Sequence, residues 1–483
     1  MDTSNTLKLE KLQSAVRAAL RAWQHVGGTP ENLLEFLLLV QQRRVDVVVD
    51  VDPATIRLAT NQVLLKTIDV LEMQDQEGAQ VLRSRFVNNN KILLVANQMN
   101  VSEHTVSRLQ RKAIERLTKI LFDQEMLVRN TRSQAIEAFL PPPSYTHLFG
   151  LDDARSKLVE QLLQPMPPWV IAILGIGGIG KTALADVVTR QVIHHFRFNQ
   201  VIWLRAEPQT MSGQSYFPQL TYETLITDLA HHLWPDARNL SPDQRVVQVR
   251  QTLRTQPHLI IIDNLETEPE TAYLLVQLNN LANPSKFLLT TRTRPSEQAT
   301  VFNFPLDELS LDDAAVLIYH HAKDIGVNAL ATATEAEIED IYRVTGGNPL
   351  ALKLVVSLLD LLPLPQILVN LQQSQPGPIE NLYRHIYWQT WKTLSPNARS
   401  LLQAMPLVAE SGGVQDYLQS LARLSEEEFW PALQELRNRS LLEVRGTLQE
   451  KQYGIHRLTD TFLRTEIINW LDNSDVNESK AKS

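Results

Sequence analysis

Apolar residues recur at helical spacing along the first part of the chain. The earliest series is three or four positions apart and predicts one face of an amphipathic helix: Leu9, Leu12, Val16, Ala19 and Trp23. A second helix is expected to start at Asp52-Pro53, an N-cap followed by proline, and to run to about Leu71. Similar patterns continue to about Val128, so residues 1–130 are predicted to form an all-helical domain.

Short apolar runs replace this pattern after a proline-rich stretch. Three consecutive prolines, at 141–143, predict a stiff linker over residues 131–145. Beyond it, apolar runs alternate with helical stretches, and the runs lie at residues 170–174, 200–204, 259–262 and 287–290. Such alternation predicts a parallel sheet covered by helices, so residues 146–305 are expected to form an α/β domain.

Helical spacing returns after residue 305 and is interrupted by one expected hairpin. Its strands are residues 441–444 and 453–455, on either side of a polar turn around Gly446. The polar residues 471–483 are expected to form a disordered tail. The chain is therefore predicted to be a multidomain protein of α/β plus α class.

The glycine-rich stretch after the first predicted strand carries the most specific chemistry. Residues 174–182 read Leu-Gly-Ile-Gly-Gly-Ile-Gly-Lys-Thr, which matches the P-loop pattern G-x-x-x-x-G-K-[ST]. Glycines let successive N–H groups point at one phosphate chain, and the helix dipole adds positive charge there. We expect Lys181 to reach the β- and γ-phosphates of a nucleoside triphosphate, and the Thr182 hydroxyl to bind Mg²⁺. The predicted cradle for a nucleoside triphosphate or diphosphate consists of Gly175, Gly177, Gly178, Ile179, Gly180, Lys181, Thr182 and Ala183.

Two later strands are expected to bring polar side chains to the same edge of the sheet. Asp263 ends the run at 259–262 and is predicted to hold Mg²⁺ through water. Thr290-Thr291-Arg292 ends the next run. Because a guanidinium fits phosphate oxygens bidentately, Arg292 is predicted to contact the γ-phosphate.

In their order along the chain, these motifs resemble the NB-ARC family of STAND-class NTPases. The resemblance spans about residues 147–464. Besides the P-loop, Asp263 and the Thr-Thr-Arg motif, it rests on His147-Leu148-Phe149-Gly150-Leu151-Asp152, the strand 201–204, the segment 346–352 (Gly-Gly-Asn-Pro-Leu-Ala-Leu) and Tyr453-Gly454-Ile455-His456-Arg457.

This resemblance implies a switch with a closed and an open state. In the family, ADP is clamped between the P-loop domain, a helical domain (here residues 306–380) and a winged-helix domain (here residues 381–470). Exchange for ATP releases the winged helix and exposes an oligomerising surface. The matching motifs place the backbone of Phe149 and Gly150 along adenine, Pro349 against the adenine ring and His456 on the β-phosphate of ADP.

Two positions depart from the family pattern. Asn264 stands where many members carry a second acidic residue, and an amide cannot accept a proton from the attacking water. Glu266 is the remaining candidate for that role, so slow ATP hydrolysis that serves a switch is expected. Arg457 replaces the aspartate that follows the family's histidine, which puts its share of closed-state locking in doubt.

The N-terminal domain contains a second motif, over residues 78–120. Its pattern predicts a helix, a tight turn at Asn100 and a second helix capped by Ser102. Residues 81–120 contain eight Lys and Arg against two Glu, a net charge of +6 in a chain whose total is −8. The segment resembles the helix-turn-helix of sigma factors. It implies DNA contacts from Thr105, Ser107, Arg108, Arg111 and Lys112.

The composition of the chain excludes some kinds of site and of partner. The chain of 483 residues contains no cysteine, which excludes disulfides and thiolate metal sites. No signal peptide or unbroken apolar span is found, so a cytoplasmic protein without a membrane partner is expected.

Three functions remain open. The first is a transcriptional regulator that binds DNA and self-associates in the ATP state, with its signal arriving either from a separate sensor partner or through residues of the winged helix itself. The second is an antiviral or stress-signalling scaffold, in which the N-terminal helices form an adaptor for a protein effector. The third is an AAA+-like ATPase acting on DNA. Residues before about 75 resemble nothing that would decide among them.

Overall fold

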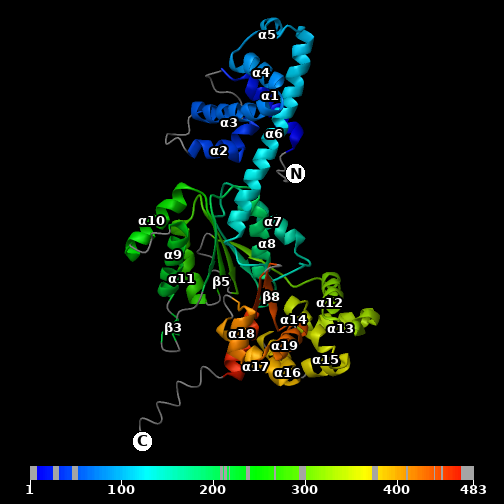
Figure 1. The fold of residues 1–483 in the computed structure, drawn as a ribbon. Helices are drawn as coiled ribbons and strands as arrows, with labels where there is room; N and C mark the ends of the chain where they lie inside the picture. The colour runs from blue at the N-terminus through cyan, green and yellow to red at the C-terminus, as the bar shows by residue number, and fades with distance from the viewer. Residues whose placement is uncertain are drawn as a thin grey trace. The chain divides into compact units, whose positions relative to one another are not determined.

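The computed structural model describes most of the chain and divides it into two compact units. The described residues are 8–24, 32–45, 53–206, 210–211, 215–216, 218–234, 240–265, 268–292, 301–372, 379–408, 412–439, 441–447 and 450–468. The units are Met1–Ala138 and Phe139–Ser483 (Figure 1). Each unit contains its own hydrophobic core.

The described part of the N-terminal unit is helical, as the sequence predicts. Its α-helices are α1 (Leu9–Arg21), α2 (Leu38–Val45), α3 (Pro53–Gln74), α4 (Gln76–Leu82), α5 (Ile92–Gln98) and α6 (Glu103–Glu137). Glu125 of α6 is fully buried, and its carboxylate accepts hydrogen bonds from the backbone N–H groups of Leu38 and Leu39 and from Arg129. These bonds satisfy free N–H groups at the start of α2 and fix it against α6.

The length of α6 corrects one expected boundary. The sequence places the end of the helical domain at residue 130 and a linker at 131–145, but α6 continues to Glu137. Residues 131–137 contain neither glycine nor proline, so nothing in them ends the helix. The linker therefore begins only after α6. The Asp52 cap predicted for α3 lies outside the described residues.

The second unit begins with a five-stranded parallel sheet. Its strand order is β2-β5-β6-β1-β7, formed by β1 (Val170–Leu174), β2 (Val201–Arg205), β5 (Leu259–Leu265), β6 (Lys286–Thr291) and β7 (Val301–Pro305). The four predicted strands are confirmed, and β7 is an edge strand that the sequence analysis missed. A separate short hairpin joins β3 (Thr210–Met211) to β4 (Ser215–Tyr216).

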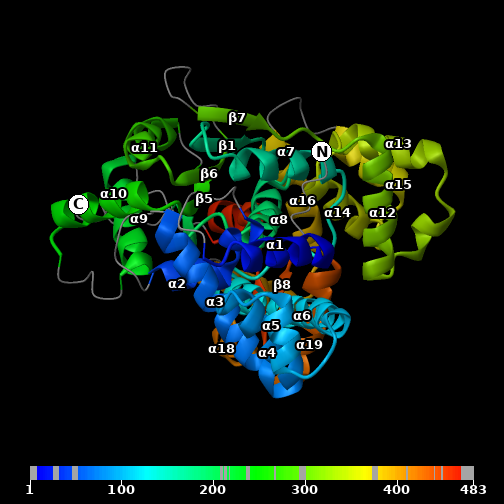
Figure 2. The same ribbon diagram turned by 90° about the horizontal axis from the view of Figure 1, so that it is seen from above.

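Helices cover both faces of this sheet (Figures 1 and 2). One face carries α9 (Pro218–Leu233), α10 (Pro242–Thr255) and α11 (Glu268–Leu281), and the other carries α7 (Asp152–Leu163) and α8 (Lys181–Ile193). Alternate strand residues, such as Val170 and Ala172 or Ile260 and Ile262, pack in the core with α9–α11. The residues between them are also buried, which explains why these strands appear as continuous apolar runs.

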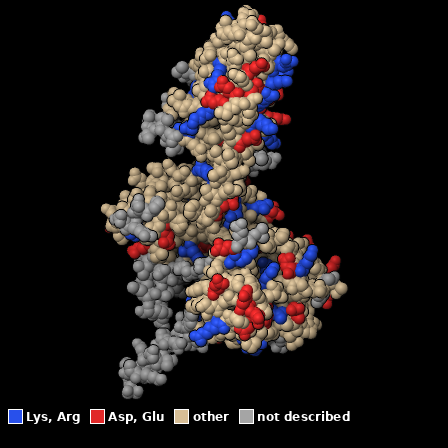
Figure 3. Space-filling view, viewed as in Figure 1, with Lys and Arg blue, Asp and Glu red and all other residues tan. Residues whose placement is uncertain are grey.

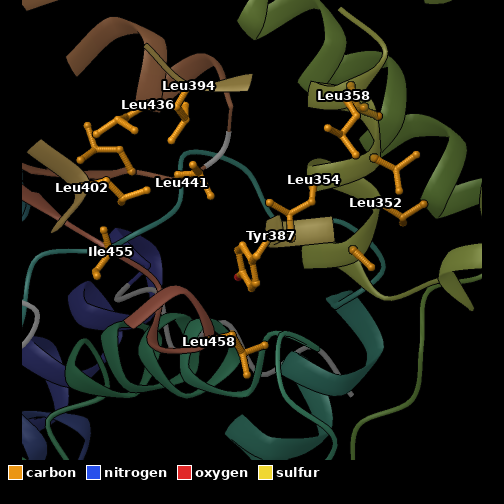
Figure 4. Packing of buried hydrophobic residues seen from close by; sticks show 14 of the residues in the cluster. Leu352, Leu354, Leu358, Tyr387, Leu394, Leu402, Leu436, Leu441, Ile455 and Leu458 are labelled. Carbon is orange, nitrogen blue, oxygen red and sulfur yellow. The ribbon is translucent and has the colours of Figure 1, made fainter. Parts of the chain in front are cut away.

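The rest of the second unit is mostly helical and shares one core. Its helices are α12 (Leu311–Ile325), α13 (Glu335–Thr345), α14 (Pro349–Leu358), α15 (Leu364–Gln372), α16 (Ile379–Thr393), α17 (Pro396–Ala404), α18 (Gln415–Ala422), α19 (Glu426–Asn438) and α20 (Arg457–Phe462). The predicted hairpin is present as β8 (Glu443–Gly446) and β9 (Lys451–Gly454). Tyr387 is buried between Leu354 and Leu458, so the core crosses the boundary expected at residue 380 (Figure 4). The winged-helix assignment stays a prediction.

Among the residues that the structure describes, no helix combines the length and apolar character needed to cross a membrane.

Candidate functional site

The glycine-rich loop joins β1 directly to α8. Gly180 is the N-cap of α8, and its φ of 104° is a left-handed conformation that suits glycine. Lys181 is the first residue of α8, and its Nζ donates to the carbonyl oxygens of Gly175 (2.8 Å) and Ile176 (2.9 Å). The lysine ammonium therefore folds back over the loop, whose N–H groups surround the start of the helix. This local geometry is that of an anion site at a helix N-terminus.

Side chains from two strand ends meet beside this loop. Asp263 is nearly fully buried, and its Oδ1 accepts from the Thr182 hydroxyl at 2.8 Å and from the Thr290 hydroxyl at 2.5 Å. Thr290 in turn accepts from the backbone N–H of Asn264 at 2.8 Å. The structure thus brings together the two residues predicted to hold Mg²⁺, and Thr290 fixes the orientation of the carboxylate.

The middle of the loop is held by residues that lie far along the chain. Asn348 is the N-cap of α14 and fully buried, and its Nδ2 donates to the carbonyl oxygen of Gly177 at 3.0 Å. The Tyr383 hydroxyl of α16 lies 3.1 Å from the same oxygen and 2.6 Å from Asn348 Oδ1. A side chain at Gly178 would place its Cβ 2.8 Å from Leu350 Cβ, so only glycine permits this approach.

His456 approaches the loop from the C-terminal part of the unit. It is the N-cap of α20, and its Nδ1 accepts a hydrogen bond from Leu458 N at 3.1 Å. Burial lowers the pKa of His456, Glu443 opposes this shift, and the nearby cations Arg292, Lys181 and Lys353 add to it. The ring is therefore neutral near pH 7, and because Nδ1 is an acceptor its proton resides on Nε2. His456 can donate a hydrogen bond to an anion.

Arg292 also lies beside the loop and directly follows β6 in the chain. A Cβ built on Gly177 would lie 3.2 Å from Arg292 Nη2 and 3.3 Å from Leu458 Cδ1. Arg292 and the start of α20 therefore both contact the P-loop at Gly177. Together with Lys181, Arg292 places two cations at this end of the site.

These groups surround one cavity of about 250 Å³. The predicted residues that line it are Phe149, Gly177, Gly178, Ile179, Gly180, Lys181, Thr182, Ala183, Asp263, Arg292, Pro349 and His456. Gly150 and Gly175 do not line it, and Glu266 lies outside the described residues. Besides the loop and the charged groups, apolar side chains line the cavity, namely Phe149, Leu309, Leu317 and Pro349.

Sequence reasoning missed several residues of this site. Tyr145 lines the cavity from the expected linker, and its hydroxyl donates to Asp186 of α8 at 2.7 Å. Lys353 and Glu443 also line the cavity. Lys353 follows Pro349 by four positions, so helical spacing from the predicted adenine contact would have found it. No local signal points to Tyr145 or Glu443.

The N-terminal unit contains a helix, a turn and a second helix in the segment 78–120 where the sequence predicts them, formed by α5 and the first part of α6. Asn100 adopts a left-handed φ of 53° in the turn, and Ser102 caps α6 by accepting from Thr105 N. A small core of Val81, Val95, Ala96 and Val106 joins α4, α5 and α6.

The five candidate DNA contacts differ in exposure. Ser107, Arg108, Arg111 and Lys112 are exposed, whereas Thr105 is half-buried and its hydroxyl lies 2.9 Å from Ser102 Oγ.

The basic residues of this unit also differ in their partners. Arg83 pairs with Asp69 and Glu72, and Arg116 pairs with Asp75 at 2.5 Å. Within the described residues, no carboxylate lies within 4 Å of Arg108, Arg111 or Lys112. Figure 3 shows Lys and Arg side chains gathered along the edge of this unit that α6 forms. The positive charge of α6 is thus largely uncompensated near the start of the helix.

Comparisons with known proteins point to a nucleotide-binding domain around this cavity. A family model described as the NB-ARC domain matches residues 151–319. Disease resistance protein RGA2 of Solanum bulbocastanum is 26% identical over 43% of this chain and 21% of its own length. Regulatory protein AfsR of Streptomyces griseus is 29% identical over 39% of this chain and 18% of its own length. The chain thus spans about a fifth of the length of these curated relatives.

Among solved structures, a STAND protein with a tetratricopeptide repeat sensor from Pyrococcus horikoshii is similar in fold. It is 20% identical, with a TM-score of 0.42, over 71% of this chain and 47% of the other.

Proposed function

Because this chain carries an NB-ARC domain over residues 151–319, we propose that it is an ATP- and ADP-dependent molecular switch. One observation carries this proposal: two residues from later parts of the unit, Asn348 and Tyr383, are hydrogen-bonded to the P-loop, and His456 lines the same cavity. A nucleotide on this loop is therefore enclosed by elements whose positions it can influence. Binding energy is then available to select between two arrangements of the unit.

The cavity provides a complementary group for each part of a nucleotide. The N–H groups at the start of α8 and the Lys181 ammonium suit the phosphates, with Arg292 and the Nε2–H of His456 as further donors. Phe149 and Pro349 add apolar surface to the cavity lining, which suits a base. Lys181 would exchange its present bonds to Gly175 and Ile176 for bonds to phosphate oxygens.

Thr182 and Asp263 fit a magnesium ion. Their oxygens lie 2.8 Å apart at the phosphate end of the cavity, and hydroxyl and carboxylate oxygens are the ligands that Mg²⁺ prefers. The ion would neutralise charge on the phosphates when bound. In this chain, Thr290 keeps the Asp263 carboxylate directed at Thr182.

Hydrolysis is proposed to be slow. Asn264 follows Asp263 with a left-handed φ of 80°, and its amide Nδ2 lies 3.4 Å from the carbonyl oxygen of Ala206. No general base is therefore available at this position to activate water. A slow ATPase suits a switch whose state is set by exchange, whereas rapid turnover would favour the AAA+-like alternative.

Release of nucleotide from the purified full chain tests the switch. The protein is denatured and the released nucleotide is identified by chromatography, with Lys181→Ala and Lys323→Ala compared in parallel. The parent and Lys323→Ala, which alters an exposed residue of α12, are expected to retain ADP. Lys181→Ala is expected to lose at least about tenfold in affinity, because a charge-assisted bond is removed. Equal ADP in all three proteins would contradict the P-loop assignment.

We further propose that the N-terminal unit binds DNA and that the ATP state self-associates. The observation that favours DNA is the exposed, uncompensated charge of Arg108, Arg111 and Lys112 at the start of α6. Oligomers would join several such helices and raise their combined affinity through effective concentration. The similarity to Regulatory protein AfsR is consistent with a regulator of transcription, and that to plant disease resistance proteins with the scaffold alternative.

Selection of DNA sequences by a fragment of residues 1–138 separates these functions. This fragment coincides with a compact unit that has its own core. Enrichment of a defined, repeated or palindromic site supports the regulator. Weak binding without sequence preference, lost steeply with salt, reduces α6 to a phosphate-attracting surface. No binding favours the adaptor, for which protein partners would then be sought.

A further inference from the structure

The cavity lining includes a carboxylate, that of Glu443, which the sequence analysis did not predict. Glu443 is the first residue of β8, and in the β8–β9 ladder it lies opposite Gly454. This register places Glu443 beside Ile455 and His456, which directly follow β9 and also line the cavity. The Glu443 side chain is half-buried and is itself part of the cavity lining.

The charged groups near Glu443 indicate that it lies close to the P-loop. Burial lowers the pKa of His456 and of Lys353, and the negative charge of Glu443 opposes both shifts. The cations Arg292 and Lys181 lower the pKa of His456 further. Glu443 is therefore close to the groups that surround the P-loop, and Asp263 and Asp307 are the other acidic residues that line the cavity. The Asp263 carboxylate accepts hydrogen bonds from two hydroxyl groups of the P-loop domain. Glu443 belongs to a different element, the C-terminal β8–β9 hairpin.

We propose that Glu443 sets the nucleotide preference of this pocket, favouring a nucleoside diphosphate over a triphosphate while the β8–β9 hairpin is docked. The inference rests on the proposed nucleotide-binding function. Lys181, Arg292 and the N-terminus of α8 compensate the charge of a diphosphate. A third phosphate adds negative charge at the end of the cavity where Glu443 is half-buried, and like charges repel strongly where water is partly excluded.

This repulsion links the nucleotide to the hairpin. A triphosphate can make all of its contacts with the P-loop only when Glu443 moves away. Because Glu443 is part of β8, it moves together with the hairpin. Because the two are thermodynamically linked, removing the carboxylate lets the triphosphate bind with the hairpin in place. Glu443 would then act as the sensor by which the C-terminal part of the unit distinguishes the two nucleotides.

Affinities of the full chain for ADP and for a non-hydrolysable ATP analogue, each with Mg²⁺, test the proposal. The variant is Glu443→Gln, which keeps the shape of the side chain and removes its charge. The matched control is Glu450→Gln, an exposed residue beside the turn of the same hairpin. We expect the preference for ADP over the ATP analogue to fall by about tenfold in Glu443→Gln, mainly through tighter analogue binding, and to be unchanged in Glu450→Gln.

A merely structural role of Glu443 gives a different result. If Glu443 serves only to neutralise Lys353, Glu443→Gln lowers the melting temperature and reduces the affinities for ADP and for the ATP analogue by the same factor. That result overturns the proposal. An unchanged ratio in a stable Glu443→Gln protein overturns it as well. If the parent binds neither nucleotide, the proposed function itself fails.

A second pair of variants keeps the test decisive if Glu443→Gln folds poorly. Glu443→Asp keeps the charge and is expected to keep most of the ADP preference. Lys353→Met removes the cation beside Glu443 and is expected to increase that preference. A smaller preference in Lys353→Met would contradict the electrostatic role of Glu443.

Discussion

The side chain of Asn348 is bonded to the backbone of Gly177, 171 positions earlier in the chain, through an Nδ2–O contact of 3.0 Å. The same side chain caps α14, because its Oδ1 accepts from Leu350 N at 3.0 Å and Ala351 N at 3.3 Å. One buried amide therefore ties the start of a helix to the middle of the P-loop. Any movement of α14 away from the loop must break this bond.

Replacing Asn348 by alanine is expected to speed the release of ADP. The change leaves the Gly177 carbonyl with Tyr383 as its remaining partner and removes the cap of α14. Loss of these buried bonds costs about 1–3 kcal/mol, and if half of this cost acts on the closed state, ADP dissociates about two to ten times faster. The rate is measured by displacement of a fluorescent ADP analogue from the full chain.

The control for this variant is Ser310→Ala, which removes the N-cap of α12. It is expected to lower the melting temperature by a similar amount without changing ADP release, because Ser310 does not contact the P-loop. Equal rates of ADP release in Asn348→Ala and the parent would show that the bond to Gly177 does not hold the closed state.

His456→Asn separates two roles of one residue. Asparagine caps helices well, so the bond to Leu458 N and the start of α20 are expected to be kept. The shorter side chain cannot present the donor that Nε2 provides to the cavity. We expect ADP to dissociate about tenfold faster while the melting temperature changes by less than about 2 °C. An unchanged rate of ADP release would contradict the proposed bond from His456 to the nucleotide. Faster release that comes only with a large loss of stability would contradict it as well.

His321 is expected to make the protein acid-sensitive. Burial, with a further contribution from Lys353, lowers the pKa of His321 to about 4 from 6.5. The unfolded chain therefore binds a proton near pH 6.5 that the folded chain accepts only near pH 4. The stabilisation is present above pH 6.5 and is lost as pH falls from 6.5 to 4, by at most about 3 kcal/mol.

Comparison of His321→Gln with the parent isolates this contribution. Melting temperatures are measured from pH 7 to pH 4.5, and the parent is expected to lose several degrees more than the variant. Parallel curves for the two proteins would exclude His321 as a source of the acid sensitivity.

The sequence predicted the P-loop and its flanking elements because a short motif determines them. The β1 strand, the turn and α8 are specified within 24 residues, and Asp263 and Arg292 follow at the ends of apolar runs. β7 was missed because its alternating pattern is weak: Val301 to Pro305 is an edge strand with no fully buried residue.

The contacts that close the site were not predictable from local patterns. Asn348 precedes Pro349 as an ordinary helix cap would, and nothing nearby indicates that its Nδ2 reaches Gly177. Tyr383 and Tyr387 lie four positions apart on α16, a spacing that by itself indicates two core residues. The structure confirms Tyr387 as a core residue but shows the Tyr383 hydroxyl bonded to the P-loop. Such roles depend on tertiary packing, which periodicity does not record.

Charge removal at the start of α6 provides the sharpest test of DNA binding. Arg108→Ala, Arg111→Ala and Lys112→Ala together are expected to lower the slope of log K against log salt by about 3, since each phosphate contact contributes about one. Arg116→Ala is the control on the same helix, because Arg116 is already paired with Asp75. Binding isotherms at several salt concentrations give the slopes for fragments of residues 1–138. If the triple variant and Arg116→Ala change the slope equally, the uncompensated charge of α6 does not define a DNA-binding surface.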